Sequence, residues 1–216
     1  CYENSAFNLN GSNYSGNDLK NISNLKKNQS KPYNVKATKE VLTAKYEGFD
    51  LHYSYFKNIL TQDSAKVLDE IKRSNIRGRG GAGFPMGLKW ESCRNEQNED
   101  KFIICNADEG DPGAYSDRYL LEKQPHLILF GMMVAGYITG AKWGILYIRA
   151  EYPESVDIVQ NAIDELRTNN LLGENIDGSN FSFDFKIIKA QGAYICGEET
   201  ALINSIEGQR PEVRTR

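Results

Sequence analysis

The 216-residue chain lacks several features that would assign it to a familiar class of protein. Its formal net charge is only −3, so it has no overall positive field to attract a nucleic-acid backbone. Its longest apolar stretch, Leu127–Ile138, is interrupted by Gly131 and Gly136 and is too short to span a bilayer. We therefore expect no nucleic-acid partner and no membrane insertion, and the apolar stretch predicts a buried helix.

Cysteine and histidine are also scarce. The four cysteines include no C-x-x-C pair, and His52 and His126 have no partner at metal-ligand spacing. This pattern is typical of a reducing compartment, and it predicts that this chain alone holds no metal ion or iron–sulfur cluster. We expect both histidines to be structural, with His126 as a cap of the long helix.

The composition divides the chain into two parts. Residues 1–40 are rich in Asn, Ser and Lys with few apolar positions, and we expect them to be disordered. Residues 41–216 are long enough for one domain with a sizeable core. The chain begins with Cys rather than Met, and its first residues do not have the pattern of a signal peptide. Its last residues, Arg210–Arg216, look like the interior of a longer chain. We therefore expect a fragment.

Helical and strand patterns alternate in the second part. Short apolar runs predict buried strands, and apolar residues at helical spacing predict helices. The expected strands span residues 101–105, 143–148 and 183–190, and the expected helices span 64–75, 115–122, 125–139, 153–168 and 198–207. This alternation is typical of a parallel sheet with right-handed crossovers. The predicted fold class is α/β, with a Rossmann-like parallel sheet flanked by helices and truncated at the C-terminus.

A glycine-rich loop, Arg77–Phe84, is the most informative segment. It places four glycines in six positions, which removes side chains from a turn and lets backbone N–H groups converge on an anion such as a phosphate. Arg77 and Arg79 add donors suited to phosphate oxygens. A flexible surface loop would explain the glycines but not the arginines, so we interpret the segment as a phosphate cradle. We expect that a side chain at Gly81 would obstruct the ligand.

The loop does not fit the standard phosphate-binding motifs. Its glycines match G-x-G-x-x-G, but a dinucleotide fingerprint needs a strand before it and a helix directly after it. Here a helix is expected first, and Pro85 and Gly87 are expected to break the next segment. The kinase triplets H-R-D and D-F-G do not occur, and a Walker A loop is excluded because Leu88 precedes Lys89. Lys89 is either a second charge for the same ligand or an ordinary exposed lysine.

A polar cluster, Asn106–Gly113, directly follows the first predicted strand. In open α/β sheets, ligands bind at the carboxyl ends of the strands, where this loop must lie. We expect Asn106, Asp108 and Glu109 to take the hydroxyl and amide groups of a polyol-bearing cofactor. The alternative is a solvent-exposed acidic turn.

Another cluster, Gly192–Thr200, lies between the third predicted strand and the last helix. Tyr194 could stack on a planar ring. Glu198 and Glu199 are expected in the first helical turn, where the helix dipole favours negative charge, so they could also be plain caps. Cys196 has no adjacent His or Arg to lower its pKa, and we expect no nucleophilic role for it.

Taken together, three segments resemble one family. They are Ile76–Trp90, Cys105–Gly113 and Gly192–Ile203. The sequence resembles the NADH-oxidising flavoprotein subunit of respiratory complex I. It is also similar to the diaphorase subunits of NAD(P)-linked hydrogenases and formate dehydrogenases. The resemblance runs from about Val41 to the last residue.

The resemblance implies that FMN and NADH bind, that hydride passes from NADH to the flavin, and that electrons then pass to iron–sulfur clusters. It implies no catalytic side chain, with Glu199 in a supporting role. Implied partners are a thioredoxin-like 2Fe–2S subunit and other iron–sulfur subunits, and the implied location is cytoplasmic, peripheral on the membrane through a larger complex. Implied FMN contacts are Gly78, Arg79, Gly80, Lys89, Asn106, Asp108, Tyr194, Gly197, Glu198 and Glu199. Implied NADH contacts are Gly81, Phe84, Asp111, Tyr194 and Glu199.

Two departures from the family pattern matter. Respiratory subunits usually carry Glu where this chain has Asp111, whereas the hydrogenase and formate dehydrogenase relatives often carry Asp. The shorter carboxylate repels a ribose 2′-phosphate less directly, which leaves the choice between NAD and NADP open. The family's 4Fe–4S cysteines and its ubiquitin-like domain lie beyond Arg216, so that cluster belongs to the full-length subunit only. The alternatives are a hydrogenase or formate dehydrogenase diaphorase subunit, or an inert nucleotide-binding fragment.

Overall fold

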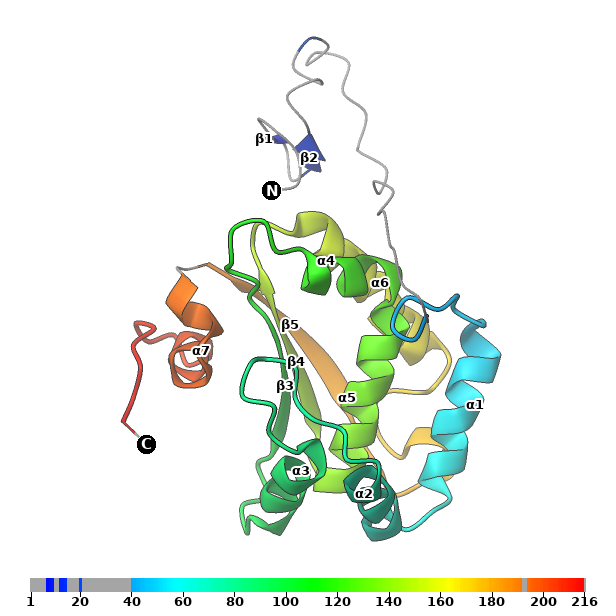
Figure 1. Ribbon diagram of the computed structural model, residues 1–216. Helices are drawn as coiled ribbons and strands as arrows, with labels where there is room; N and C mark the ends of the chain where they lie inside the picture. Colours follow the sequence, from blue (N-terminus) through cyan, green and yellow to red (C-terminus); the bar gives the residue numbers. More distant parts are fainter. Residues whose placement is uncertain (1–6, 10–11, 15–19, 21–39, 192–193, 216) are drawn as a thin grey trace.

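A computed structural model describes residues 7–9, 12–14, 20, 40–191 and 194–215 (Figure 1). The prediction of disorder over residues 1–40 falls mostly outside the described residues and stays a prediction. Within that segment, β1 (Phe7–Leu9) and β2 (Ser12–Tyr14) pair as a short antiparallel ladder, which is not predicted from the sequence.

The main sheet has three parallel strands in the described part of the chain, in the order β3-β4-β5. They are β3 (Phe102–Ala107), β4 (Trp143–Arg149) and β5 (Asp184–Ala190). The crossovers between them contain α4 (Ser116–Lys123), α5 (Pro125–Thr139) and α6 (Pro153–Thr168). The predicted α/β fold with parallel strands is therefore confirmed.

Helices cover both faces of this sheet, but unequally. Figure 1 shows α5 and α1 (Phe49–Leu60) on one side of the strands and α7 (Glu199–Ile206) on the other. The large apolar cluster lies on the α5 side, where Leu146 and Ile148 of β4 pack with Phe56 of α1, all with none of their surface exposed. A smaller cluster joins Tyr147 to Leu202 of α7. Alternate residues of one strand thus enter different clusters, as the period of two requires.

A helix, α3 (Met86–Asn95), directly follows the glycine-rich loop, so the prediction that Pro85 and Gly87 break the chain there is wrong. Pro85 is the N-cap residue, where its missing N–H costs nothing because the first helical N–H groups have no partner anyway. Gly87 faces α2 (Ser64–Arg73): a Cβ at Gly87 would lie 2.7 Å from Cγ of Lys72. The glycine is therefore the residue that lets the two helices approach closely.

The remaining helices follow from local chemistry. Asp63 caps α2, because its side chain accepts a hydrogen bond from the backbone N–H of Ala65 at 2.7 Å. α5 ends at Gly140, whose φ of +79° closes the helix in the left-handed conformation. No counterpart of α1, which buries Tyr53 and Phe56 on one face, is predicted from the sequence. Within the described residues, no helix is both long and apolar enough to cross a membrane.

Close approach of α5 to the sheet gives a prediction about stability. A Cβ at Gly136 would lie 2.5 Å from Cε2 of the buried Phe183 ring, whereas a Cβ at Gly131 of the same helix would meet nothing within 4 Å. We expect Gly136→Ala to lower the free energy of unfolding by about 1–3 kcal/mol, because the core is already filled. Gly131→Ala should raise it by about 0.5–1 kcal/mol through helix propensity. Urea denaturation measures both, and equal effects would contradict close packing at Gly136.

A histidine cluster joins α1 to α5. His52 Nε2 lies 3.3 Å from the backbone oxygen of His126, and the Tyr53 hydroxyl lies 3.0 Å from His126 Nδ1. His126 Nε2 lies 3.2 Å from Glu165 of α6. His126 is the second residue of α5, and Gln124 is its N-cap, so the expected cap role of His126 is wrong while its structural role holds.

This cluster predicts a pH dependence of stability. Burial lowers the pKa of both His52 and His126 below the ordinary 6.5, against the opposing pull of Glu47 on the first and Glu165 on the second. Well above pH 6.5 both histidines are neutral in the folded and the unfolded chain, and their neutral state costs no stability. As the pH falls below that value, the unfolded chain binds protons first, so the free energy of unfolding should decrease. Urea denaturation across this range should show a shallower decrease for His126→Asn, and an unchanged decrease would contradict the assignment.

Candidate functional site

The candidate site lies where the three strands end. β3 ends at Ala107, β4 at Arg149 and β5 at Ala190, and the pairing register places these ends beside one another. Because the carboxyl ends of parallel strands meet at one edge, the loops that follow β3 and β5 leave the sheet together. The polar cluster that follows β3 and the one that follows β5 are therefore close to each other.

Asn106 links the two clusters. Its side-chain amide Nδ2 donates to the backbone oxygen of Gly197 at 2.8 Å, and its Oδ1 accepts from the N–H of Asp108 at 3.2 Å. The strand β3 runs two residues further than predicted, so Asn106 belongs to the strand rather than to the loop. Its exposed side chain therefore points to the sheet face that α7 partly covers.

Asp108 carries an unsatisfied oxygen. Its Oδ2 is buried and has no hydrogen-bond partner among the described residues. Burial raises the pKa of this carboxyl group, Arg149 opposes the rise and Glu151 adds to it. Gly197 stands directly opposite, since a Cβ there would be 3.4 Å from the backbone oxygen of Asp108. A buried acceptor without a donor is costly, and a ligand hydroxyl would satisfy it.

Tyr194 presents an exposed aromatic face. It begins the 3-10 turn Tyr194–Gly197 and is 69% exposed. Its Cα and one side of its ring pack on Gly110. A Cβ at Gly110 would lie 3.0 Å from Cδ2 of Tyr194, so the glycine allows this contact between the clusters. Gly192 and Ala193, which begin the predicted motif, lie outside the described residues.

The acidic residues of the two clusters separate into different environments. Glu109, predicted to face a ligand, instead has a buried carboxylate that accepts from Ser116 Oγ at 2.9 Å at the start of α4. Glu198 is the N-cap of α7 and accepts from the backbone N–H of Thr200 at 2.9 Å, so the capping alternative is confirmed for it. Asp111 and Glu199 are exposed. Sequence position alone could not separate these four carboxylates.

The glycine-rich loop is closed by its own hydrogen bonds. The N–H of Gly78 donates to the oxygen of Phe84 at 2.9 Å, and Nη1 of Arg77 donates to the oxygen of Gly83 at 3.2 Å. Arg77 thus holds the loop, whereas the sequence predicts a phosphate donor there. Gly81 has a φ of +115°, so the backbone itself requires glycine at this position, in addition to any need of a ligand.

The outer surface of this loop is accessible. Arg79 and Lys89 are exposed, Phe84 is 55% exposed, and a Cβ at Gly80 would meet nothing within 4 Å. The loop connects α2 to α3. Figure 1 draws it next to β3, on the same side of the sheet as α7. The residues predicted to bind one ligand come from three regions, which are the glycine loop with the start of α3, the end of β3 with the loop after it, and the turn before α7 with the start of that helix.

Two of the described cysteines, Cys105 and Cys196, lie in environments that disfavour reactivity. Cys196 is completely buried, and burial raises the pKa of the Cys105 thiol to about 12, with a contribution from Asp117. A thiol in such an environment is inert. In the described ranges, no three His, Cys, Asp or Glu side chains are grouped to hold a metal ion.

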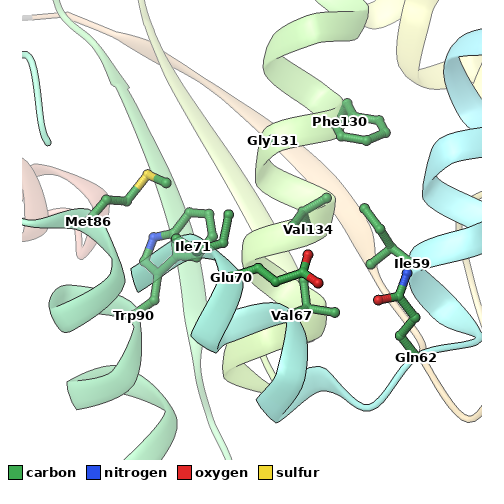
Figure 2. A pocket seen from close by; sticks show the side chains of 10 residues that line it. All are labelled: Ile59, Gln62, Val67, Glu70, Ile71, Met86, Trp90, Phe130, Gly131 and Val134. Carbon is green, nitrogen blue, oxygen red and sulfur yellow. The ribbon is translucent and has the colours of Figure 1, made fainter. Parts of the chain in front are cut away.

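An apolar pocket of about 290 Å³ lies elsewhere, between α1, α2, α3 and α5 (Figure 2). Trp90 and Met86 close one end and Ile59 and Gln62 the other, and Glu70 is its charged side chain. The pocket shares no residue with the three candidate ligand loops. Because a phosphate needs several donors and this pocket offers mainly apolar walls, we do not assign a nucleotide to it.

The sequence is similar to subunits of larger redox enzymes. It is 49% identical to the NADP-reducing hydrogenase subunit HndC of Solidesulfovibrio fructosivorans, over 76% of this chain and 33% of that protein. It is 47% identical to the NAD-reducing hydrogenase HoxS subunit alpha of Cupriavidus necator, over 70% and 25%. It is 41% identical to the mitochondrial NADH-ubiquinone oxidoreductase 51 kDa subunit of Neurospora crassa, over 74% and 33%. The chain thus spans about a quarter to a third of the length of these curated relatives.

The fold has counterparts among solved structures, and the sequence matches a family model. A chain of the NAD+-reducing NiFe-hydrogenase in the air-oxidized state superimposes with a TM-score of 0.72 at 29% identity, covering 98% of this chain and 37% of that one. The same type of enzyme in the H2-reduced state gives 0.67 at 35% identity, over 76% and 28%. Residues 71–216 match the model of the Nuo51 FMN-binding domain. Because this match covers more than half of the chain, the chain belongs to the Nuo51 FMN-binding domain family.

Proposed function

We propose that this chain is the FMN- and NADH-binding part of an NADH dehydrogenase flavoprotein subunit. The observation that carries the proposal is the buried Oδ2 of Asp108, which has no donor among the described residues at the place where two strand-end loops meet. A ribityl hydroxyl of FMN is a donor of the required kind. Membership of the family and the names of the relatives support the same conclusion.

Each group of FMN has a suitable counterpart in this chain. The backbone amides around Gly78 and Gly80, with Arg79 and Lys89, suit the phosphate, since they combine N–H groups with positive charge. Asp108 and Asn106 suit the ribityl hydroxyls, and the exposed ring of Tyr194 suits stacking on the flavin. Gly197, Glu198 and Glu199 border the same space at the start of α7. The bound flavin would supply the hydride-accepting and one-electron chemistry.

The nucleotide would lie on the solvent side of the flavin. Phe84 and Tyr194 are exposed aromatic side chains at the glycine loop and at the strand-end loop, and each can stack on a base or nicotinamide ring. A Cβ at Gly81 would meet nothing within 4 Å, so the backbone there is open to a ligand. Asp111 and Glu199 are exposed carboxylates that can accept hydrogen bonds from ribose hydroxyls, and the short side chain of Asp111 repels a 2′-phosphate only weakly. We therefore propose NAD(H) as the substrate, with this chain orienting the two rings and no side chain acting as a base.

The second candidate is a diaphorase subunit of an NAD(P)-linked hydrogenase or formate dehydrogenase. Two relatives at 49% and 47% identity are hydrogenase subunits, which favours this alternative. In either case we propose that electrons leave through iron–sulfur subunits, including a thioredoxin-like 2Fe–2S subunit, in a cytoplasmic, peripheral part of the assembly. The 4Fe–4S cluster would be held by the full-length subunit.

The experiment uses the full-length protein purified with its companion subunits. After reconstitution with FMN, anaerobic addition of NADH should bleach the flavin absorbance band. Flavin uptake without bleaching would favour the inert nucleotide-binding fragment, and a protein that takes up no FMN would refute the proposal. Electron transfer to quinone or to a hydrogenase centre then separates the two candidates.

The glycine loop gives a sharper prediction. We expect Gly80→Val to lower bound FMN by about tenfold or more, because a branched side chain would fill the space that a phosphate needs. The melting temperature should stay unchanged, since the backbone of Gly80 is not left-handed and a Cβ there meets nothing within 4 Å. Absorbance gives the flavin-to-protein ratio.

The matched control is Gly131→Val, which adds the same side chain at a position of α5 where a Cβ would also meet nothing within 4 Å. It should retain full flavin. Gly81→Val is less informative, because its φ of +115° strains any side chain. Stoichiometric FMN in Gly80→Val would show that this loop is not the cradle.

A further inference from the structure

Glu109 lies in the middle of a flavin-site loop, yet its side chain faces away from the ligand space. The residue is only 8% exposed, and its carboxylate accepts from Ser116 Oγ at 2.9 Å and from the N–H groups of Asp117 at 3.1 Å and Arg118 at 3.4 Å. The hydroxyl of Tyr152 donates to it at 3.3 Å. A charged carboxylate is costly to bury, and these four hydrogen bonds replace those that it would make with water.

These bonds make Glu109 the cap of α4. The N-cap residue of that helix, Tyr115, provides no side-chain hydrogen bond to it. Glu109, which lies in the loop before α4, accepts these hydrogen bonds instead of Tyr115. Its negative charge lies at the positive end of the helix dipole. Ser116 comes seven residues after Glu109 in the sequence, so the bond also closes the intervening loop that carries Asp111.

The backbone of Glu109 is held as well. Nη1 of Arg149, at the end of β4, donates to the main-chain oxygen of Glu109. Arg149 is itself oriented by Glu151, with Nη2 2.9 Å from Oε1, and lies over the Tyr152 ring at 5.5 Å. Arg118 lies over the same ring at 5.3 Å. Glu109 is therefore anchored through its side chain to α4 and Tyr152, and through its carbonyl to β4.

The neighbours of Glu109 are the residues that face the ligand space. Asp108, whose buried Oδ2 has no partner in the part of the chain that the structure describes, comes directly before it, and Gly110, which packs on Tyr194, comes directly after it. A residue held at both its side chain and its carbonyl sets the direction in which its two neighbours point. A displacement of about 1 Å at a reacting site can cost about a hundredfold in rate.

We propose that Glu109 and Arg149 are positioning residues of the flavin site, which act through Asp108 and Gly110 without touching the cofactor. The inference rests on the proposed function. It predicts that loosening either anchor weakens FMN binding and changes the environment of the bound flavin, beyond any general loss of stability.

The test uses Glu109→Gln and Arg149→Met in the full-length protein with its companion subunits. Gln keeps the size of Glu, but its single carbonyl oxygen cannot serve four donors. We expect the FMN dissociation constant to rise about tenfold or more in both variants. At saturating FMN, the visible circular dichroism of the bound flavin should also differ from that of the unaltered protein. Arg149→Lys keeps a donor for the carbonyl and should recover part of the affinity.

The matched control is Glu122→Gln. Glu122 is an equally buried carboxylate of α4 that bonds the same Arg118, at 2.6 Å, and Ser155 at 3.1 Å, but it lies outside the flavin loop. It should lose stability and keep both FMN affinity and the flavin spectrum.

The outcomes separate the inference from the proposed function. FMN affinity in Glu109→Gln and Arg149→Met equal to that of Glu122→Gln would overturn the positioning role while the proposed function stands. An unaltered protein that takes up no FMN would overturn both. If Glu109→Gln fails to fold, Arg149→Met alone tests the positioning role, because this variant leaves the buried carboxylate and its donors in place.

Discussion

The parallel pairing of β3, β4 and β5 is the constraint on which the rest of the structure depends. Hydrogen bonding in register places Ala107 beside Ile148, and Arg149 beside Ala190, so the strands end at one edge. The contacts between the two strand-end loops start from that edge. The apolar face against α5 holds the register, because a slip of one residue would turn Leu146 and Ile148 away from the core.

At this edge, burial and hydrogen bonding give chemically similar side chains different tasks. Asp108 keeps a buried oxygen without a donor among the described residues, Glu109 caps α4 and Glu198 caps α7. The glycine loop shows the same division, since Arg77 closes the loop while Arg79 stays exposed. A flavin domain needs both kinds of residue, those that meet the cofactor and those that hold them in place.

The elements with the strongest periodicity could be predicted from the sequence. The bounds of α5 and α6 agree with the expected helices, and the three strands lie where the apolar runs indicate. The helix α3 could not be predicted, because Pro85 and Gly87 are unfavourable by propensity and acceptable only through capping and through contact with Lys72. Contacts between residues distant in sequence therefore determine that this segment is helical.

The motifs of this chain determined its family and indicated the loops of the candidate site, because glycines, carboxylates and an aromatic residue occur at fixed spacing in three short segments. Only the tertiary structure decided the role of each side chain. The donors that bind Glu109 come from α4 and Tyr152, and the carbonyl of the same residue is held from β4. Such partners are distant in sequence, and whether a carboxylate faces ligand or protein depends on where they lie in space.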